Sequence, residues 1–554
     1  MTKMPIKLRT SSIFIIVIFL LLTLSVSRVH AQAVWENTDN EIYNFLSRQA
    51  QKGTIVLDDQ IQPITRKEIS RHLDSLEAKR NDLTPKEQKE LTFYRKEYSE
   101  FNVNLKDSLT FLRKDEAQRW RVFGVKKDGF ILRAEPVLGI GTIQGSGQNI
   151  FRTSNGLSFW GQAGKHFGFQ FYFRDITEHG TGIDSLRQFT PEPGIVRAGD
   201  LEDPKSINYS DLRGYVSYSW KNGSIAIGKD QLLWGYGQTG RVVLSDKAPA
   251  YPFIRLDYRP LKWLGFEYHH AWLQSGVLDS AQFYSKGNGV YGNEREFFVP
   301  KFMASHTLSF YPWKGLSLFM GESIVYSDQL EIGYLIPIMF FKAYDQYVSR
   351  YNINAGSNGQ FFFGINSRNN IPKTQLYGSL FIDEIRLSTV TDQNKSRNQL
   401  GFTIGGKITD VLLSYLTLGV EYTRINPFVY DNIIPAQTYT SETYSLGDWM
   451  GNNADRFTLS ANYTPVAKLK TSFYFQKIRK GGPGTLDQQY FAEPQPDFLF
   501  DHQKDINRFN AVVSYELINK LYIRAAITID KQKDYVNSVT TTPKQAQLGI
   551  SYGW

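Results

Sequence analysis

The sequence predicts a mainly β protein: a transmembrane antiparallel β-barrel of about 18 strands with a small N-terminal α-helical domain. Three observations predict it. Short segments of the chain alternate apolar and polar residues, as strands with one face in lipid must. The composition is rich in Tyr, Phe and Gly (32, 38 and 44 residues) and lacks cysteine. The N-terminus carries the pattern of an export signal.

Residues 1–31 are predicted to be a signal peptide that is absent from the mature chain. Lys3, Lys7 and Arg9 form its basic region, residues 13–26 are apolar, and small residues precede a cleavage site after Ala31. A membrane anchor is the alternative. An apolar stretch of roughly 14 residues is short for a spanning helix, which needs about 20.

Charge and cysteine content exclude several classes of function. Without cysteine there is no disulfide, thiolate nucleophile or Cys-based metal site. The formal net charge is +9, and loss of residues 1–31 leaves 59 basic against 54 acidic side chains, or +5. No dense basic run remains, so no nucleic-acid partner is expected. Beyond the leader no apolar run is long enough to span as a helix, so any crossing must use strands.

Residues 36–115 are predicted to form a periplasmic bundle of three short amphipathic helices, packed under or into the barrel mouth. Thr65 stands three residues before Glu68, and Thr84 three before Glu87, which is the spacing of a capping box. Pro85 suits the first position of a helix. The apolar faces recur at helical spacing and comprise Ile42, Phe45, Leu46, Ala50, Ile69, Leu73, Leu76, Leu91, Tyr94 and Tyr98.

Residues 118–554 are predicted to form an outer-membrane barrel. The alternation is clearest at the C-terminus, where Leu548, Ile550, Tyr552 and Trp554 alternate with polar residues and glycine. The predicted strands are 129–142, 156–164, 167–176, 212–220, 224–234, 253–259, 265–273, 301–311, 316–326, 360–366, 376–387, 399–408, 414–425, 456–464, 469–478, 507–517, 521–530 and 544–554. Every second connection is short and most of the others are long, including 143–155, which is the asymmetry of periplasmic turns and extracellular loops.

Three local features depart from a plain barrel pattern. His270 falls on a predicted lipid face. Asp383 and Glu384 interrupt the alternation of their strand, which predicts a β-bulge. Residues 337–350 have helical spacing within a large external loop and are predicted to cap the barrel from outside.

No catalytic constellation, metal site or cofactor site is expected, and the chain is predicted not to be an enzyme. His269 and His270 are neighbours on one strand, so they point to opposite faces and cannot share a ligand. Neither HExxH nor GxSxG before a helix occurs. Carboxylate pairs such as Glu202/Asp203 are more simply solvated loop charges.

The predicted long loops combine aromatic, amide and charged groups that suit a polysaccharide. Flat rings cover the apolar faces of sugars, and Arg or Lys pairs with acidic groups. Aromatic girdles occur in all such barrels, so a structural role is the alternative. The residues predicted to bind polysaccharide are Trp234, Tyr236, Arg241, Tyr291, Arg295, Tyr444 and Trp449.

Several short blocks in consistent order resemble the Wzi family of capsule assembly proteins. They are residues 42–46, Gly53, 63–69, 228–235, 244–249 and 381–384. The resemblance implies an eighteen-stranded outer-membrane barrel with an N-terminal helical bundle. It also implies a lectin-like role in attaching capsular polysaccharide to the cell surface. No sugar-contacting residue is carried over from the family.

Three classes of function follow. The favoured one is a non-catalytic barrel that binds surface polysaccharide, with outer-membrane lipid and other capsule export components as further partners. The second is a porin or specific channel, because a barrel this wide can enclose an aqueous pore. The third, a barrel enzyme acting on lipid or glycan, lacks a recognisable motif.

Overall fold

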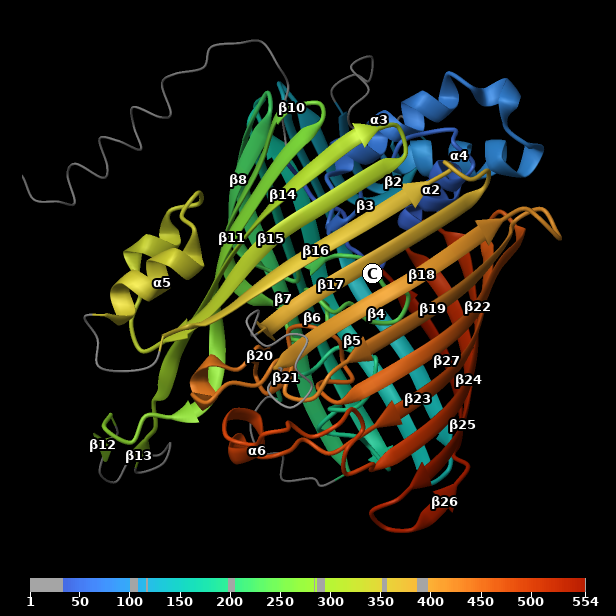
Figure 1. The fold of residues 1–554 in the computed structure, drawn as a ribbon. Coiled ribbons are helices and arrows are strands. Elements are labelled where there is room, and N and C mark those ends of the chain that lie inside the picture. Colours follow the sequence, from blue (N-terminus) through green and yellow to red (C-terminus); the bar gives the residue numbers. More distant parts are fainter. Residues whose placement is uncertain are drawn as a thin grey trace, which may run out of the picture.

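The computed structural model describes residues 33–99, 108–115, 118–197, 205–282, 284–285, 294–350, 356–385 and 397–553. The predicted signal peptide, residues 1–31, lies outside the described residues. The described chain forms a closed antiparallel barrel with helices at one end (Figure 1). Among the described residues, no helix is both long and apolar enough to cross a membrane.

Eighteen strands build the wall, and each pairs antiparallel with its neighbours. β27 pairs with β25 on one side and with β4 on the other, and this closes the barrel. The wall strands are β4 (Phe130–Gly145), β5 (Gln148–Ala163), β6 (Phe167–Thr181), β7 (Ser206–Trp220), β8 (Gly223–Asp230), β10 (Tyr251–Leu261), β11 (Leu264–Leu278), β14 (Phe298–Trp313), β15 (Leu316–Ser327), β16 (Asn358–Arg368), β17 (Thr374–Ile385), β18 (Asn398–Thr409), β19 (Leu416–Ile425), β22 (Ala454–Val466), β23 (Leu469–Lys480), β24 (Lys504–Ile518), β25 (Leu521–Asp534) and β27 (Lys544–Tyr552).

The predicted barrel is confirmed, and each predicted strand overlaps one wall strand. The predicted long loop 143–155 is wrong. Only Ser146 and Gly147 separate β4 from β5, and both have positive φ, as a tight hairpin turn requires. The strands continue past the apolar band, where the outward side chains no longer need to be apolar, so the sequence pattern fades before the strands end.

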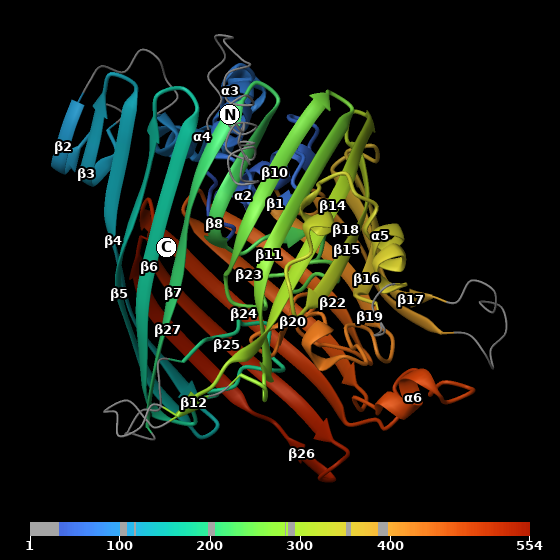
Figure 2. The same ribbon diagram turned by 90° about the vertical axis from the view of Figure 1, so that its left-hand side faces the viewer.

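A hairpin of β2 (Ser108–Lys114) and β3 (Trp120–Lys127) extends the sheet beside β4. β3 pairs with β4 from Phe130 to Ala134, whereas β27 pairs with the rest of β4 from Leu138 to Gln144. Figure 2 shows this hairpin beside β4, at the same end as the helices. Residues 108–114 were expected in the helical bundle and are instead a strand.

The outer surface of the wall is apolar. Ile404, Ile527 and Leu548 are each more than half exposed, with values of 57%, 55% and 56%. An apolar surface this extensive is a liability in water and is the normal contact with acyl chains in a membrane barrel.

The three predicted helices are confirmed as α2 (Ile42–Gln51), α3 (Arg66–Glu77) and α4 (Pro85–Glu97). Their predicted apolar faces form one buried core. Thr84 and Glu87 make the complete capping box at α4. At α3, Thr65 accepts a hydrogen bond from the Glu68 N–H, as predicted for that half of the box.

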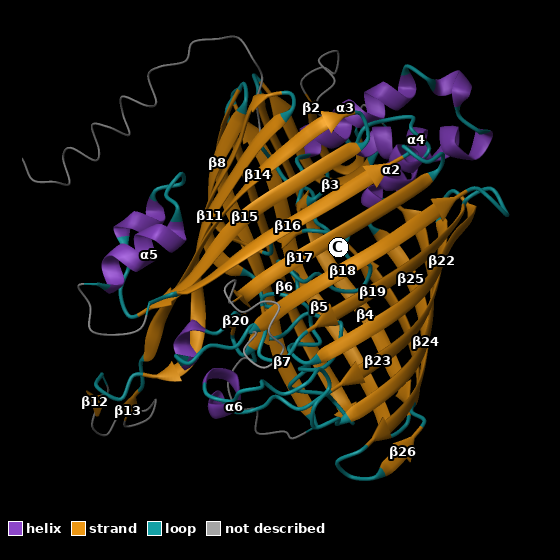
Figure 3. Cartoon of the chain, viewed as in Figure 1, coloured by secondary structure: helices purple, strands orange, loops and turns teal. Residues whose placement is uncertain are grey.

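The helices pack against the end of the barrel that carries the short turns, here called the turn end; the opposite end is the loop end (Figure 3). Arg48 of α2 donates to Asp410 in a short turn at 2.5 Å. Lys86 of α4 donates to the carbonyl of Thr464 at 2.8 Å. Through these contacts the helices lie against the turn end of the barrel.

Candidate functional site

The lumen is occupied by folded segments of the loops rather than by water alone. Residues 183–195, 231–250 and 426–453, here called the plug, lie inside the wall, and so do residues 33–36. Apolar plug residues pack against lumenal residues of the wall such as Phe253 and Phe362. Two plug residues, Leu233 and Trp234 in β9 (Leu233–Trp234), pair with Gln62 and Ile61 in β1 (Ile61–Gln62), which links the plug to the helical domain.

Buried hydrogen bonds join the three plug segments to one another. The Lys247 ammonium donates to the carbonyls of Arg187, Thr190 and Glu192. The hydroxyls of Tyr430 and Tyr439 donate to the carbonyls of Val242 and Val243 at 2.7 and 2.9 Å. Because these donors are consumed within the protein, the plug behaves as a folded unit and not as a set of free loops.

Charged groups of the wall hold the plug in place. The Arg456 guanidinium on β22 donates to both carboxylate oxygens of Asp448 at 3.1 and 3.0 Å, and both side chains are fully buried. Glu421 on β19 accepts from the backbone N–H of Gln238 at 2.8 Å. Asp383 accepts from the backbone N–H of Tyr430 at 2.6 Å. The predicted bulge lies between Ile382 and Glu384 and is confirmed.

The structure places four of the residues that were predicted to bind polysaccharide inside the plug. Trp234, Tyr236, Tyr444 and Trp449 are all buried in the plug. Their polar atoms are used internally, since Tyr236 donates to Asp59, Tyr444 to the Leu186 and Ile195 carbonyls, and Trp449 to the Thr239 carbonyl.

The other three residues of the predicted set are Arg241, Tyr291 and Arg295. Arg241 is half-buried and donates to the Gly235 carbonyl and to Gln62. Tyr291 lies outside the described residues. Arg295 belongs to β13 (Glu294–Arg295), which pairs with β12 (Tyr284–Ser285), and only its backbone is described. The structure brings none of the described members of this set together on an open surface.

One open space in the lumen is a cavity of about 920 Å³ beside the plug, toward the loop end. We call it the chamber. Residues of five neighbouring strands line it, together with three residues from β6 and β23 and a few plug residues. The polar ones include Arg152, Ser154, Glu178, Arg187, Tyr474, Gln476, Arg508, Asn510, Arg524, Thr528, Asp530, Gln532, Gln545 and Gln547.

The chamber combines planar charged groups, amides and an aromatic ring. Arg508 pairs with Asp530 at 2.7 Å, and Arg152 pairs with Glu178 at 2.7 Å, so the charges are balanced by fixed partners. Amides, guanidinium groups and carboxylates together can both donate hydrogen bonds to hydroxyl groups and accept hydrogen bonds from them. The arrangement therefore suits a neutral or weakly charged, hydroxyl-rich ligand.

The chamber residues were not identified as a site from the sequence, although the alternation of the strands already placed them on the lumenal face. Asn510, Arg524, Thr528 and Gln547 fall on the polar face of strands whose alternation had already assigned that face to the lumen. The sequence pattern does not show that the plug fills the other side of the lumen and leaves this side open.

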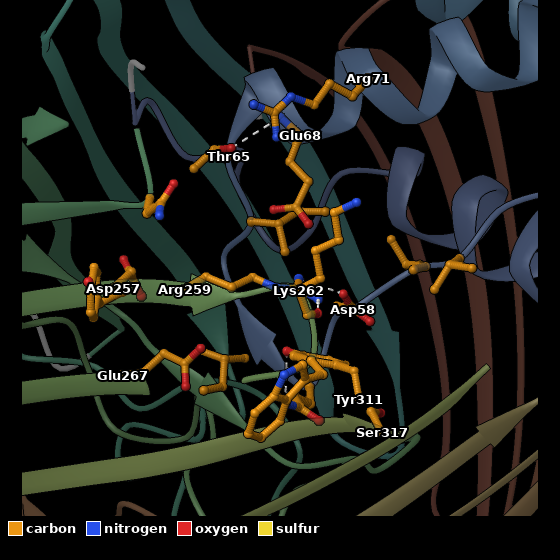
Figure 4. Close-up of a pocket in the computed structure, with 18 of the residues that line it drawn as sticks. Asp58, Thr65, Glu68, Arg71, Asp257, Arg259, Lys262, Glu267, Tyr311 and Ser317 are labelled. Atoms are coloured by element: carbon orange, nitrogen blue, oxygen red, sulfur yellow. Dashed lines mark hydrogen bonds and ion pairs between the residues drawn. The ribbon is translucent and has the colours of Figure 1, made fainter. Parts of the chain in front are cut away.

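A second cavity of about 1090 Å³ lies at the turn end, between α3 and strands β8, β10, β11 and β14 (Figure 4). It shares no lining residue with the chamber. Arg259 pairs with Asp58 at 2.8 Å and lies over the Tyr311 ring at 4.1 Å. Glu68 points into this recess from α3, together with Lys262 from a turn. The recess holds carboxylates and cations but no arrangement that resembles a known catalytic set.

The Glu68 carboxyl gives the helical domain a pH-dependent stability. Burial and the negative charge of Asp58 raise its pKa from 4.5 to about 7. The native state therefore retains a proton that the unfolded chain releases, and stability falls as pH rises from about 4.5 to about 7. The effect is modest, because 33% of the side chain is exposed.

We expect Glu68→Gln to remove this fall, so that the variant gains stability over the native chain at pH 8 but not at pH 4. Unfolding midpoints in denaturant at the two pH values measure it. Identical pH profiles for the two chains would show that Glu68 is not the group responsible.

The closed eighteen-strand wall, its apolar exterior and its polar lumen define an outer-membrane β-barrel protein. No protein-family model matches the sequence, and no curated protein matches it. Among solved structures, the chain is similar to Wzi of Escherichia coli, an outer-membrane protein involved in group 1 capsule assembly and a carbohydrate-binding β-barrel. The TM-score is 0.58 at 13% identity, over 95% of this chain and 100% of that one.

Two other solved structures show a weaker likeness. OccK3 of Pseudomonas aeruginosa has a TM-score of 0.41 at 14% identity, over 76% of this chain and 95% of its own. OccAB4 of Acinetobacter baumannii has a TM-score of 0.43 at 8% identity, over 76% and 97%. At 13% identity, the likeness to Wzi establishes the fold alone.

Proposed function

We propose that this outer-membrane barrel binds surface polysaccharide at its loop end, without catalysis, and thereby helps to retain or assemble that polysaccharide at the cell surface. The observation that carries the proposal is the combination of a plug anchored by buried charges with a polar chamber toward the loop end. A plug that fills part of the lumen obstructs free diffusion, whereas a fixed polar cavity suits a ligand that stays bound.

Three further points support the proposal. The fold is similar to that of Wzi, which binds carbohydrate, and the sequence blocks noted above resemble that family. The chamber lining consists of amides, hydroxyls and paired charges. With short turns on the periplasmic side, as is usual for these barrels, the helical domain lies in the periplasm, where other capsule export components would meet it.

Deletion of the gene tests the role in cells. We expect cell-bound polysaccharide to fall and released polysaccharide to rise by a similar amount, because synthesis continues while attachment fails. The control is re-expression of the unaltered chain, which should restore retention. Unchanged retention in the deletion strain would count against the proposal.

A solute channel is the second candidate, because the barrel is wide and the polar chamber runs beside the plug. Measurement of ion conductance distinguishes a polysaccharide-binding barrel from a solute channel. A binding barrel with a closed plug shows no ion-conducting steps in a planar bilayer, whereas a channel shows them at once.

A further inference from the structure

A segment of one external loop lies on the outside of the wall. Residues 328–350, here called the flap, contain a short helical turn, η3 (Ile332–Leu335), and the helix α5 (Phe341–Ser349). Figures 1 and 2 both show α5 outside the wall and beside its strands, between the two ends of the barrel. The predicted helix in this loop is confirmed, but it covers the side of the barrel rather than the mouth.

The wall beneath the flap carries a polar pair on its outer face. His306 on β14 and Glu322 on β15 are direct cross-strand partners, with 3.2 Å between their side chains. The next outward residues in the same row across the sheet are Tyr268 and Leu256 on one side and Phe361, Ile382 and Leu400 on the other. Glu322 lies near the middle of β15, where an uncovered charge facing lipid is destabilising.

The flap donates hydrogen bonds to the Glu322 carboxylate and packs against the His306 ring. The Glu322 carboxylate accepts the backbone N–H groups of Phe341 and Lys342 at 2.6 and 3.4 Å, so it caps the N-terminus of α5 from the wall. The Phe341 ring lies 4.6 Å from the His306 ring. As a result, the carboxylate is 5% exposed and is bonded on both sides.

A second contact between the flap and the wall lies closer to the loop end than the His306–Glu322 pair. His270, the residue that breaks the lipid-face pattern in the sequence, bonds to the Tyr326 hydroxyl at 2.7 Å. Tyr326 in turn packs against Tyr334 of the flap, with ring centroids 4.7 Å apart. These two contacts explain why polar residues stand on an otherwise apolar outer face.

The outward side of the flap is itself apolar. Ile338, Ile332 and Phe340 are 83%, 74% and 55% exposed. The Phe340 ring lies 6.3 Å from Phe361 of the wall, so this apolar surface continues directly into the lipid-facing surface of β16. Since η3 and α5 satisfy much of their own backbone hydrogen bonding, helical structure of this kind tolerates hydrocarbon.

We propose that the flap is seated in the outer half of the membrane, with its outward residues in contact with lipid acyl chains and its inward side covering the His306–Glu322 pair. Over β11, β14 and β15 the flap, and not the wall, would then form the surface that contacts lipid, and the wall would lie behind it. This inference rests on the membrane position of the barrel and is independent of polysaccharide binding.

Site-directed spin labelling tests the proposal, because the chain contains no cysteine and each introduced thiol is unique. A nitroxide at Ile338→Cys is compared, in the full chain in phospholipid vesicles, with labels at Ile527→Cys on the bare wall and Val536→Cys in a hairpin beyond the wall. Frequent collisions of the nitroxide with oxygen indicate a hydrocarbon environment, and frequent collisions with a water-soluble nickel chelate indicate an aqueous one. We expect the Ile338 label to match Ile527, with the same result at Ile332→Cys.

Two outcomes would overturn the lipid contact. One is a nickel accessibility at Ile338 equal to that at Val536. The other is exclusion of both reagents, which would show that a second copy of the chain covers the flap.

A second variant tests the anchor. Glu322→Gln in the Ile338→Cys background is expected to increase the mobile component of the spectrum severalfold, because the helix loses its charged cap, while Asp328→Asn, a flap carboxylate outside this contact, should leave it unchanged. An unaltered spectrum in Glu322→Gln would contradict the anchoring role of Glu322.

Discussion

A barrel from which part of the plug has been removed is expected to conduct ions, whereas the intact chain is not. Replacing residues 232–248 with a short Gly-Ser linker between β8 and β10 removes the apolar residues that fill one side of the lumen, including Leu232, Val242 and Leu244. It also removes the Lys247 contacts that hold segment 183–195. A lumen of this strand number then admits water, as in porins.

Single-channel recording in planar bilayers measures the effect. The intact chain should give no steps above baseline, and the shortened chain should give porin-like steps. The matched control replaces residues 486–495, which contain α6 (Leu486–Tyr490) and lie outside the plug, with a linker of the same kind. Equal conductance of the intact and shortened chains would contradict a closed plug and favour the channel.

Replacement of Arg456 by Ala is expected to destabilise the plugged barrel by about 3–5 kcal/mol, which is the typical cost of removing one member of a buried ion pair. The cost is at the upper end of single substitutions because two buried carboxylates, Asp448 and Glu421, are left facing the space that the guanidinium occupied. Denaturant unfolding of the folded barrel in lipid or detergent measures the free energy difference.

A double-mutant cycle distinguishes loss of the pair from loss of packing. Asp448→Ala alone and together with Arg456→Ala should show that the double variant is less destabilised than the sum of the two single variants. Arg479→Ala provides a matched control, since that guanidinium pairs with Asp455 but is 40% exposed, and we expect a cost of about 1 kcal/mol or less. Additive losses for Arg456 and Asp448 would show that they are not coupled.

The wall and the helices could be predicted because each follows from a local rule. In the wall, the outward residues must be apolar wherever that face meets lipid, and the lipid-facing residues of β24, β25 and β27 obey this rule throughout the apolar band. In the helical domain, Thr84, Pro85 and Glu87 mark the start of α4 by chemistry that operates within four residues.

The plug could not be predicted because its contacts are remote in sequence. Tyr444 meets Leu186 and Trp449 meets Thr239, across more than 200 residues, so nothing near these aromatics tells whether they are exposed. One local signal was available: Val242, Val243 and Leu244 form an apolar run inside a supposed external loop, and such a run is more consistent with burial than with a sugar-binding surface.

The polar residues on the outer face of the wall also have partners that a local sequence pattern cannot predict. His270 and Glu322 conflict with the lipid-face rule only until the flap, which begins six residues after Glu322, folds back over them. A break in a strong pattern therefore marked a real feature, although its cause lay in a loop whose path the pattern does not encode.

Direct binding of polysaccharide by the purified barrel tests the central claim most directly. Polysaccharide isolated from the producing cells is titrated into the detergent-solubilised protein, and into a variant in which Tyr474→Ala and Gln547→Ala alter the chamber. A variant altered on the outer wall, Ile527→Ala, serves as control. The account predicts saturable binding by the native chain and the control, and a loss of at least about tenfold in the chamber variant, which corresponds to about 1.4 kcal/mol. Equal affinity in all three proteins, or no binding by the native chain, would contradict it.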